Sequence, residues 1–157
     1  MSQVVLLDTG VLGLASNPRI SANANACMRW IDSLLAAGDF PRVPAITDYE
    51  VRRELLRAGK TRGQARLDAL IEIMGYLPLS PRTLCLAAHL WADARQRGRP
   101  TALDAALDAD VILAAQAQEI LTDFGPSVIV ATGNVAHLSR YVEARPWQDI
   151  QPSQPPG

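Results

Sequence analysis

Short apolar runs alternate with longer amphipathic stretches along the chain, and this alternation predicts the elements of the fold. Continuous apolar runs of four or five residues are typical of strands buried on both faces. The sequence has such runs at residues 4–7 and 127–131, and two further short strands are predicted at residues 42–46, where Pro41 and Pro44 limit pairing, and 75–79. Capping residues, glycines and helical periodicity between the runs predict helices at residues 22–37, 47–58, 62–73, 81–96, 108–122 and 134–142. A glycine-containing turn is expected directly after the first strand.

Strands that alternate with helices indicate an α/β fold, in which a short parallel sheet is covered by helices on both faces. We therefore expect a three-layer α/β/α domain over residues 1–150. Residues 151–157 are rich in proline and glutamine, which predicts a disordered tail. Open parallel sheets place their sites at the carboxyl ends of the strands, so candidate residues are sought just after each run.

Composition fits one soluble domain, because 48% of the 157 residues are hydrophobic and 20% are charged. The net charge of −1 gives no global basic field and argues mildly against a nucleic-acid partner. The N-terminus lacks the basic segment of a signal peptide, and its apolar run is too short to span a membrane, so a cytoplasmic location is expected. Cys27 and Cys85 lack metal-type spacing, and both are interpreted as buried, reduced thiols.

Two acids follow the first two predicted strands. Asp8 ends the first strand, where its carboxylate would point into the crevice beyond the sheet or cap a following helix. Glu50 follows the second strand in a Thr-x-x-Glu pattern, which predicts a capping box with Thr47. Taken alone, Glu50 favours the cap, although a first-turn glutamate would still lie near the crevice.

Asp110 is the most informative acid, because helical spacing places it on the apolar stripe that includes Leu107, Leu113 and Ala114. An acid on such a stripe is costly to bury without a partner. The helix dipole would help a carboxylate in the first turn only in part, and a metal ion is the most economical partner. Asp108 lies on another face and is either a surface charge, the helix N-cap or a supporting group of the site.

Polar residues also follow the last predicted strand. Thr132 and Asn134 could orient a phosphate or a metal-bound water, or they form a turn and the cap of the last helix. Among the basic residues after Glu50, Arg52 and Arg53 are the candidates for contacts with RNA phosphates. His89 and His137 are isolated in the sequence and lack ligand spacing, so both are expected on a helix surface or partly buried.

Together these pieces resemble the PIN-domain family, and within it the VapC-like toxins of toxin–antitoxin pairs. The matching segments are residues 7–12 (LDTGVL), 47–55 (TDYEVRREL), 110–117 (DVILAAQA), 130–138 (VATGNVAHL) and 147–150 (WQDI). They span nearly the whole chain in the family's order, although each is short. The family often has a fourth acid at the place of Asn134, so this sequence departs from the pattern there.

The resemblance implies a Mg²⁺- or Mn²⁺-dependent endoribonuclease with Asp8, Glu50 and Asp110 as metal ligands. Three converging carboxylates repel one another, and a divalent cation relieves that repulsion. Attack by water rather than by the ribose 2′-hydroxyl would leave 5′-phosphate and 3′-hydroxyl ends. The resemblance further implies a homodimer and a small antitoxin protein that occupies the active-site groove. The alternatives are an RNA-processing nuclease without an antitoxin and a catalytically weak RNA- or protein-binding module, which Asn134 favours.

Overall fold

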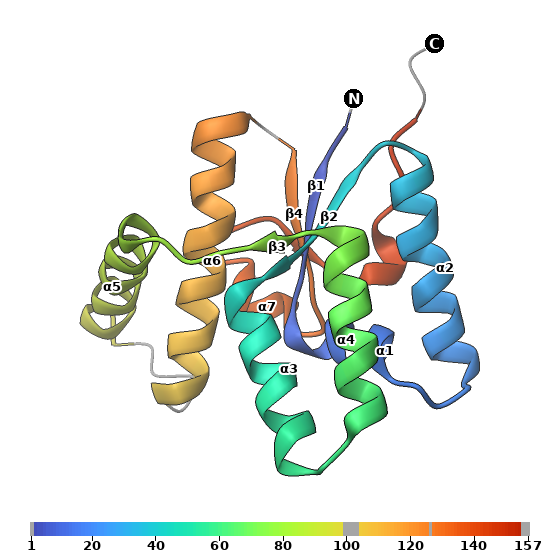
Figure 1. Ribbon diagram of the computed structural model, residues 1–157. Coiled ribbons are helices and arrows are strands. Elements are labelled where there is room, and N and C mark those ends of the chain that lie inside the picture. Colours follow the sequence, from blue (N-terminus) through green and yellow to red (C-terminus); the bar gives the residue numbers. More distant parts are fainter. Residues whose placement is uncertain (1, 99–103, 126, 155–157) are drawn as a thin grey trace.

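The computed structural model describes residues 2–98, 104–125 and 127–154. Its centre is a five-stranded sheet in the order β3-β2-β1-β4-β5, and all four pairings are parallel. The strands are β1 (Val4–Leu7), β2 (Phe40–Pro44), β3 (Tyr76–Leu77), β4 (Val128–Ala131) and β5 (Ala144–Arg145). Helices cover the sheet on both faces, so the predicted α/β/α architecture is confirmed (Figure 1).

Alternate residues of the central strand point to opposite faces and divide the core in two. Val5 and Leu7 of β1 lie in one cluster with residues of α1, α2 and α4, whereas Leu6 lies in the other with α6 residues such as Leu113. All three β1 side chains are fully buried, which is the reason for the continuous apolar run in the sequence. Figure 1 shows α6 on one side of the sheet and α2 and α4 on the other.

The helices follow the predicted pattern with four differences, at α1, α3, α6 and α7. They are α1 (Thr9–Ser16), α2 (Ala22–Ala36), α3 (Ala45–Arg57), α4 (Thr61–Met74), α5 (Pro81–Gln96), α6 (Asp104–Phe124) and α7 (Val135–Leu138), with a 3₁₀ turn at Trp147–Asp149. The predicted turn after β1 is wrong, because residues 9–16 form α1. Gly10 and Gly13 suggested a turn, but Val11, Leu12 and Ala15 lie on one helical face and are buried. Helix α7 is shorter than expected, and α6 is longer at both ends.

Strand β2 begins and ends two residues earlier than predicted. Pro44 cannot donate a ladder hydrogen bond, and it serves as the N-cap residue of α3, which starts at Ala45. The predicted helix start at Thr47 is therefore wrong, and Thr47 lies within the first turn. Its hydroxyl donates to the carbonyl oxygen of Pro44 at 3.0 Å.

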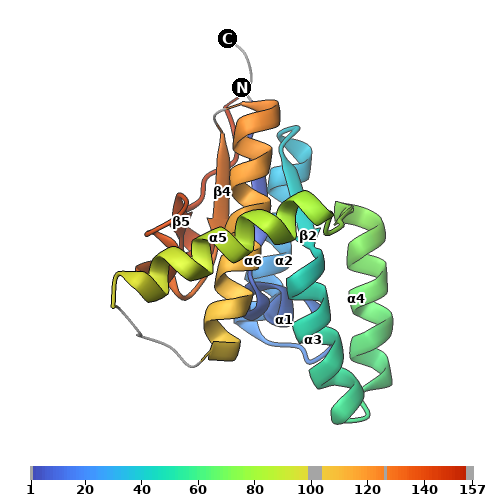
Figure 2. The ribbon, with the colours of Figure 1, turned by 90° about the vertical axis from the view of Figure 1, so that its left-hand side faces the viewer.

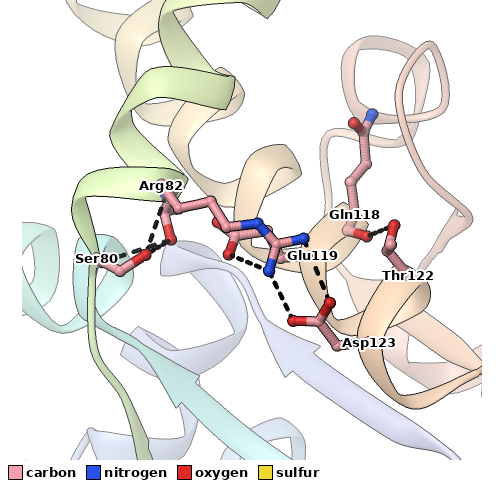
Figure 3. A network of polar contacts seen from close by, with 7 residues as sticks. Ser80, Arg82, Gln118, Glu119, Thr122 and Asp123 are labelled. Atoms are coloured by element: carbon pink, nitrogen blue, oxygen red, sulfur yellow. Dashed lines mark hydrogen bonds and ion pairs between the residues drawn. The ribbon is translucent and has the colours of Figure 1, made fainter.

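Helix α5 lies outside α6, as Figure 2 shows, and a polar network ties the two helices together. The guanidinium of Arg82 near the start of α5 lies 2.9 Å from Asp123 Oδ2 and 3.8 Å from Glu119 Oε2 of α6 (Figure 3). Ser80 caps α5 by accepting from Thr83 N, and the side chain of Thr83 accepts from Ser80 N in return. This helix pair forms the outer layer on the α6 face of the sheet.

Residues 151–154 have no regular secondary structure, and hydrogen bonds at Gln151 and Ser153 tie them to the body of the protein. Residues 155–157 lie outside the described part, and the disordered tail over residues 151–157 stays a prediction. Trp30 Nε1 donates to the carbonyl oxygen of Ile150 at 2.9 Å. The buried Asp39 carboxylate accepts from the backbone N–H groups of Gln3 and Ser153. These bonds fasten the last described residues to the amino end of the sheet.

The two cysteines differ in burial. Cys27 is fully buried, and burial raises the pKa of its thiol to about 11. Cys85 is exposed on α5, so the prediction of two buried thiols is wrong for this residue. Both are free cysteines, as expected. Over residues 2–98, 104–125 and 127–154, no helix has the length and apolar character needed to cross a membrane.

Candidate functional site

The carboxyl ends of the two central strands bring Asp8 and Thr132 together. Asp8 follows β1 and Thr132 follows β4, and the pairing of Leu7 with Ala131 places the two residues side by side. Thr132 is buried, and its hydroxyl donates to Asp8 Oδ2 at 2.6 Å. The backbone N–H of Asn134 donates to the same hydroxyl at 2.8 Å, which directs the hydroxyl proton towards Asp8.

Asp8 is also the N-cap residue of α1, so its two predicted roles coexist. Its Oδ1 accepts from the backbone N–H of Thr9 at 2.7 Å, while Oδ2 receives the Thr132 bond. Both oxygens are therefore held in place by local backbone and a neighbouring strand. The start of α1 also adds favourable dipole charge beside this carboxylate.

Glu50 reaches the same site from α3. Its Oε1 accepts a hydrogen bond from Thr9 Oγ1 at 2.8 Å, and its Oε2 lies 3.5 Å from Arg53 Nη2. The predicted capping box with Thr47 is wrong, because α3 begins at Ala45 and places Glu50 in its second turn. Thr9 thus connects the two acids, because its backbone N–H donates to Asp8 and its hydroxyl donates to Glu50. The sequence assigned Thr9 no role, because the bond spans 41 residues of chain.

Asp110 is the third acid near this edge of the sheet, and it comes from α6, which covers the sheet face opposite to α2 and α4. It lies in the second turn of α6, not in the first, and its side chain is only 15% exposed. Burial raises the pKa of Asp110 to about 6; the charge of Asp8 and, more weakly, that of Glu50 act in the same direction. His137 opposes this rise, and its Nδ1 lies 3.7 Å from Asp110 Oδ2. Three acids from three elements therefore share one electrostatic environment.

His137 is the second residue whose placement the sequence did not reveal. The sequence shows it as an isolated histidine, yet in the structure it lies on α7 with its Nδ1 near Asp110. The structure gives no support to Asp108 as a supporting group of the site, because its side chain is exposed. Helix α6 begins at Asp104, four residues before it. Asp108 is therefore not the N-cap. Asn134 occupies the N-cap position of α7 but makes no side-chain capping bond, and its side chain is exposed.

The two arginines expected near RNA differ in their surroundings. Arg52 lies 3.0 Å from Asp48 and 2.7 Å from Asp68, so its charge is neutralised by ion pairs that join α3 to α4. Arg53 borders the acids, where it contacts Glu50 and lies over the Tyr49 ring at 5.1 Å. A role of either arginine in RNA binding stays a prediction, and Arg53 is the better placed of the two.

The carboxylates of Asp8, Glu50 and Asp110 are suitable ligands for a hard divalent cation, but the three side chains are not close enough together to bind one ion in this conformation. Carboxylate oxygens are the ligands that Mg²⁺ and Mn²⁺ prefer, and burial together with the charges of Asp8 and Glu50 raises the pKa of Asp110. In the described part of the chain, no three His, Cys, Asp and Glu side chains are arranged so that they could hold a metal ion. Asp8 and Glu50 are instead connected through Thr9.

The sequence matches no protein-family model and no curated protein. The fold, in contrast, is similar to that of chains in two solved structures. One is VapBC2 from Rickettsia felis bound to a DNA fragment from their promoter, with a TM-score of 0.67 and 16% identity, over 92% of this chain and 98% of that chain. The other is VapBC-1 from nontypeable Haemophilus influenzae, with a TM-score of 0.65 and 16% identity, over 93% of this chain and 99% of that chain. The expected PIN-like fold is thereby confirmed.

Proposed function

We propose that this chain is a metal-dependent endoribonuclease that acts as the toxin of a toxin–antitoxin pair. The observation that carries the proposal is the convergence of Asp8, Glu50 and Asp110 at one edge of the sheet, where burial first, and then the charges of Asp8 and Glu50, raise the pKa of Asp110. Acids that depress one another's ionisation are typical of catalytic sites. The fold shared with chains of two VapBC structures supports the toxin assignment.

Asp8, Glu50 and Asp110 would hold the cation, which is Mg²⁺ or Mn²⁺ on this proposal. When bound, such an ion lowers the pKa of water and stabilises charge on phosphate oxygens. The chain's own residues preorganise the acids. Thr132 and the Thr9 amide fix the rotamer of Asp8, and the Thr9 hydroxyl orients Glu50. Burial of Asp110 keeps bulk water from screening its charge, which strengthens its attraction for a cation.

Cleavage of a single-stranded RNA, with chelator or with added Mg²⁺ or Mn²⁺, tests the enzymatic part. We expect metal-dependent cleavage with 5′-phosphate products, and no cleavage by Asp8→Asn. Asp32→Asn, on an exposed position of α2, is the matched control and should cleave as the wild type does. Full activity of Asp8→Asn in the presence of metal would refute this site.

Metal binding is measured separately, because it does not require that the right RNA is found. Isothermal titration of the wild type with Mn²⁺ should give binding heat that is lost in Asp110→Asn. Unchanged titration curves for the two proteins would exclude Asp110 as a ligand.

The toxin part is tested by expression of the chain alone and with the small gene next to its own. Growth arrest relieved by the neighbour is the expected result. If the chain is harmless while the purified protein cleaves RNA, it is an RNA-processing nuclease without an antitoxin. A catalytically weak binding module is the second candidate, favoured by Asn134 at the place of a fourth acid and by the open spacing of the acids.

A further inference from the structure

A groove runs from the candidate site along α3 to the turn between α3 and α4. It consists of two adjoining cavities of about 430 and about 410 Å³, which share Asn17, Pro18 and Lys60 in their walls. The first cavity starts at Thr9 and Glu50, and the second ends at Arg19 and Arg62. The groove is thus continuous with the acids and leads away from them.

The walls of this groove carry a charge opposite to that of the whole chain. Five cationic side chains line it, against two carboxylates, in a protein whose net charge is −1. The carboxylates are Glu50 and Glu54; the cations are Arg19, Arg53, Arg57, Lys60 and Arg62. We call these two cavities the basic groove. Its local positive potential answers the objection that the net charge raised against a nucleic-acid partner.

The uncompensated charge lies at the end far from the acids. Arg53 pairs with Glu50, and Arg57 pairs with Glu54. Arg19, Lys60 and Arg62 form no ion pair with any residue that the structure describes, and their side chains are exposed. Exposed cations contact phosphates without a large desolvation cost, and they position a nucleic-acid strand without reading its sequence.

The dimensions of the basic groove suit an extended strand. Glu50 and Arg57 are seven positions apart on α3, which corresponds to about 10 Å at the rise of an α-helix, and the turn that follows adds Lys60 to the wall. Asn17 and Thr61 add polar groups to the walls at the cationic end. A charged groove that follows the backbone is the usual binding mode for single-stranded nucleic acid.

Building on the proposed ribonuclease function, we propose that the basic groove binds the sugar–phosphate backbone of a single-stranded RNA on one side of the cleaved bond. Lys60 and Arg62 contact phosphates at its far end. The acids repel a polyanion, so these cations supply the attraction that holds the strand across the site. Because the contacts are to phosphates, the groove strengthens binding of every base sequence to a similar extent.

The test compares Lys60→Gln/Arg62→Gln with a control of equal charge change, Arg29→Gln/Arg97→Gln. Arg29 and Arg97 are exposed on α2 and at the end of α5, outside the groove walls. Binding of a fluorescent, mixed-sequence single-stranded RNA is measured with EDTA over a fourfold range of salt. Loss of two phosphate contacts should lower the slope of log affinity against log salt by about 1.4, so the wild type loses about sevenfold more affinity over that range than the groove variant. In cleavage assays with metal, Lys60→Gln/Arg62→Gln should have a higher KM for the same RNA than the wild type and the same kcat.

The outcomes separate this inference from the proposal on which it rests. If the wild type neither binds nor cleaves RNA, the ribonuclease proposal fails and the groove assignment fails with it. If the wild type does both and the groove variant matches the control in salt slope and KM, the groove assignment alone is overturned. If the groove variant binds RNA normally but loses the neighbour-encoded partner, the groove is a protein-binding surface and the RNA assignment is wrong.

Discussion

Replacing Asp110 with asparagine should stabilise the metal-free protein at neutral pH. The substitution removes a negative charge while it keeps the shape of the side chain. In the wild type this charge is held in a mostly buried position beside Asp8 and Glu50, and among the described residues His137 opposes the repulsion. The fold therefore tolerates the ionised carboxylate at a cost in stability, as expected for a site kept ready for a cation.

The size of the effect follows from the pKa of Asp110, which rises from 3.8 to about 6. Each pKa unit corresponds to about 1.4 kcal/mol, so ionisation costs the folded state about 3 kcal/mol. The side chain is only 15% exposed, and solvent screening removes little of this cost. Because the folded pKa of Asp110 lies above its unfolded value, the stability that protonated Asp110 contributes is fully present below about pH 4 and is lost as the pH rises through about 6.

Urea unfolding of the wild type and Asp110→Asn in EDTA, at a series of pH values, measures this difference. The two proteins should be equal near pH 4, and the variant should gain up to about 3 kcal/mol by pH 7.5. In thermal unfolding at pH 7.5 the same gain appears as about 6–12 °C. Asp108→Asn, exposed on the same helix, is the control and should stay within about 0.5 kcal/mol of the wild type at every pH.

Added Mg²⁺ provides an independent check. A ligand that binds only the folded state raises its stability, so Mg²⁺ should stabilise the wild type and close the gap to the variant. The electrostatic reasoning is refuted if Asp110→Asn is no more stable than the wild type at pH 7.5. It is also refuted if the difference between the two proteins is the same at pH 4.

Three further substitutions test other parts of the site and the fold. Thr9→Val keeps the shape of the residue but removes its hydrogen bond to Glu50. We expect the cleavage rate to fall at least about tenfold with little change in stability, whereas full activity would show that Glu50 needs no such orientation. Asn134→Asp adds an anionic oxygen beside the proposed metal site and should reach half-maximal cleavage at lower Mg²⁺, whereas superimposable titrations would mean that this position does not contact the metal. Asp39→Ala leaves the N–H groups of Gln3 and Ser153 without their charged acceptor and should cost about 2–4 kcal/mol in urea unfolding; a loss below about 0.5 kcal/mol would show that the chain end does not depend on this carboxylate.

The sequence alone determined the architecture, because burial leaves a periodic trace in the order of residues. The runs at 4–7 and 127–131 mark strands covered on both faces, and they became the central pair of the sheet. The same periodicity predicted α2, α4 and α5 to within about two residues. The strand ends also pointed to Asp8 and Glu50 as candidates, since parallel strands have their carboxyl ends on one edge, and helical periodicity pointed to Asp110 on an apolar stripe.

Local patterns failed where distant parts of the chain decide the outcome. Helix α1 forms although it contains two glycines, because its apolar face is buried against α2, α3 and α4. Strand β2 shifted by two residues because Pro44 became the N-cap of α3. In both places tertiary packing outweighs the intrinsic preference of the residues, which amounts to only about 1 kcal/mol per glycine.

Only the tertiary structure decided which side chains of the site contact one another. Thr9 contacts Glu50 across 41 positions, and Thr132 contacts Asp8 across 124. His137 faces Asp110 because α7 follows β4 on the α6 side of the sheet. Side-chain pairing of this kind depends on direction and distance in space, and neither has a period along the chain. The sequence therefore identifies the three candidate acids, while the fold alone determines which hydroxyl groups and which histidine contact them and which groove lies beside them.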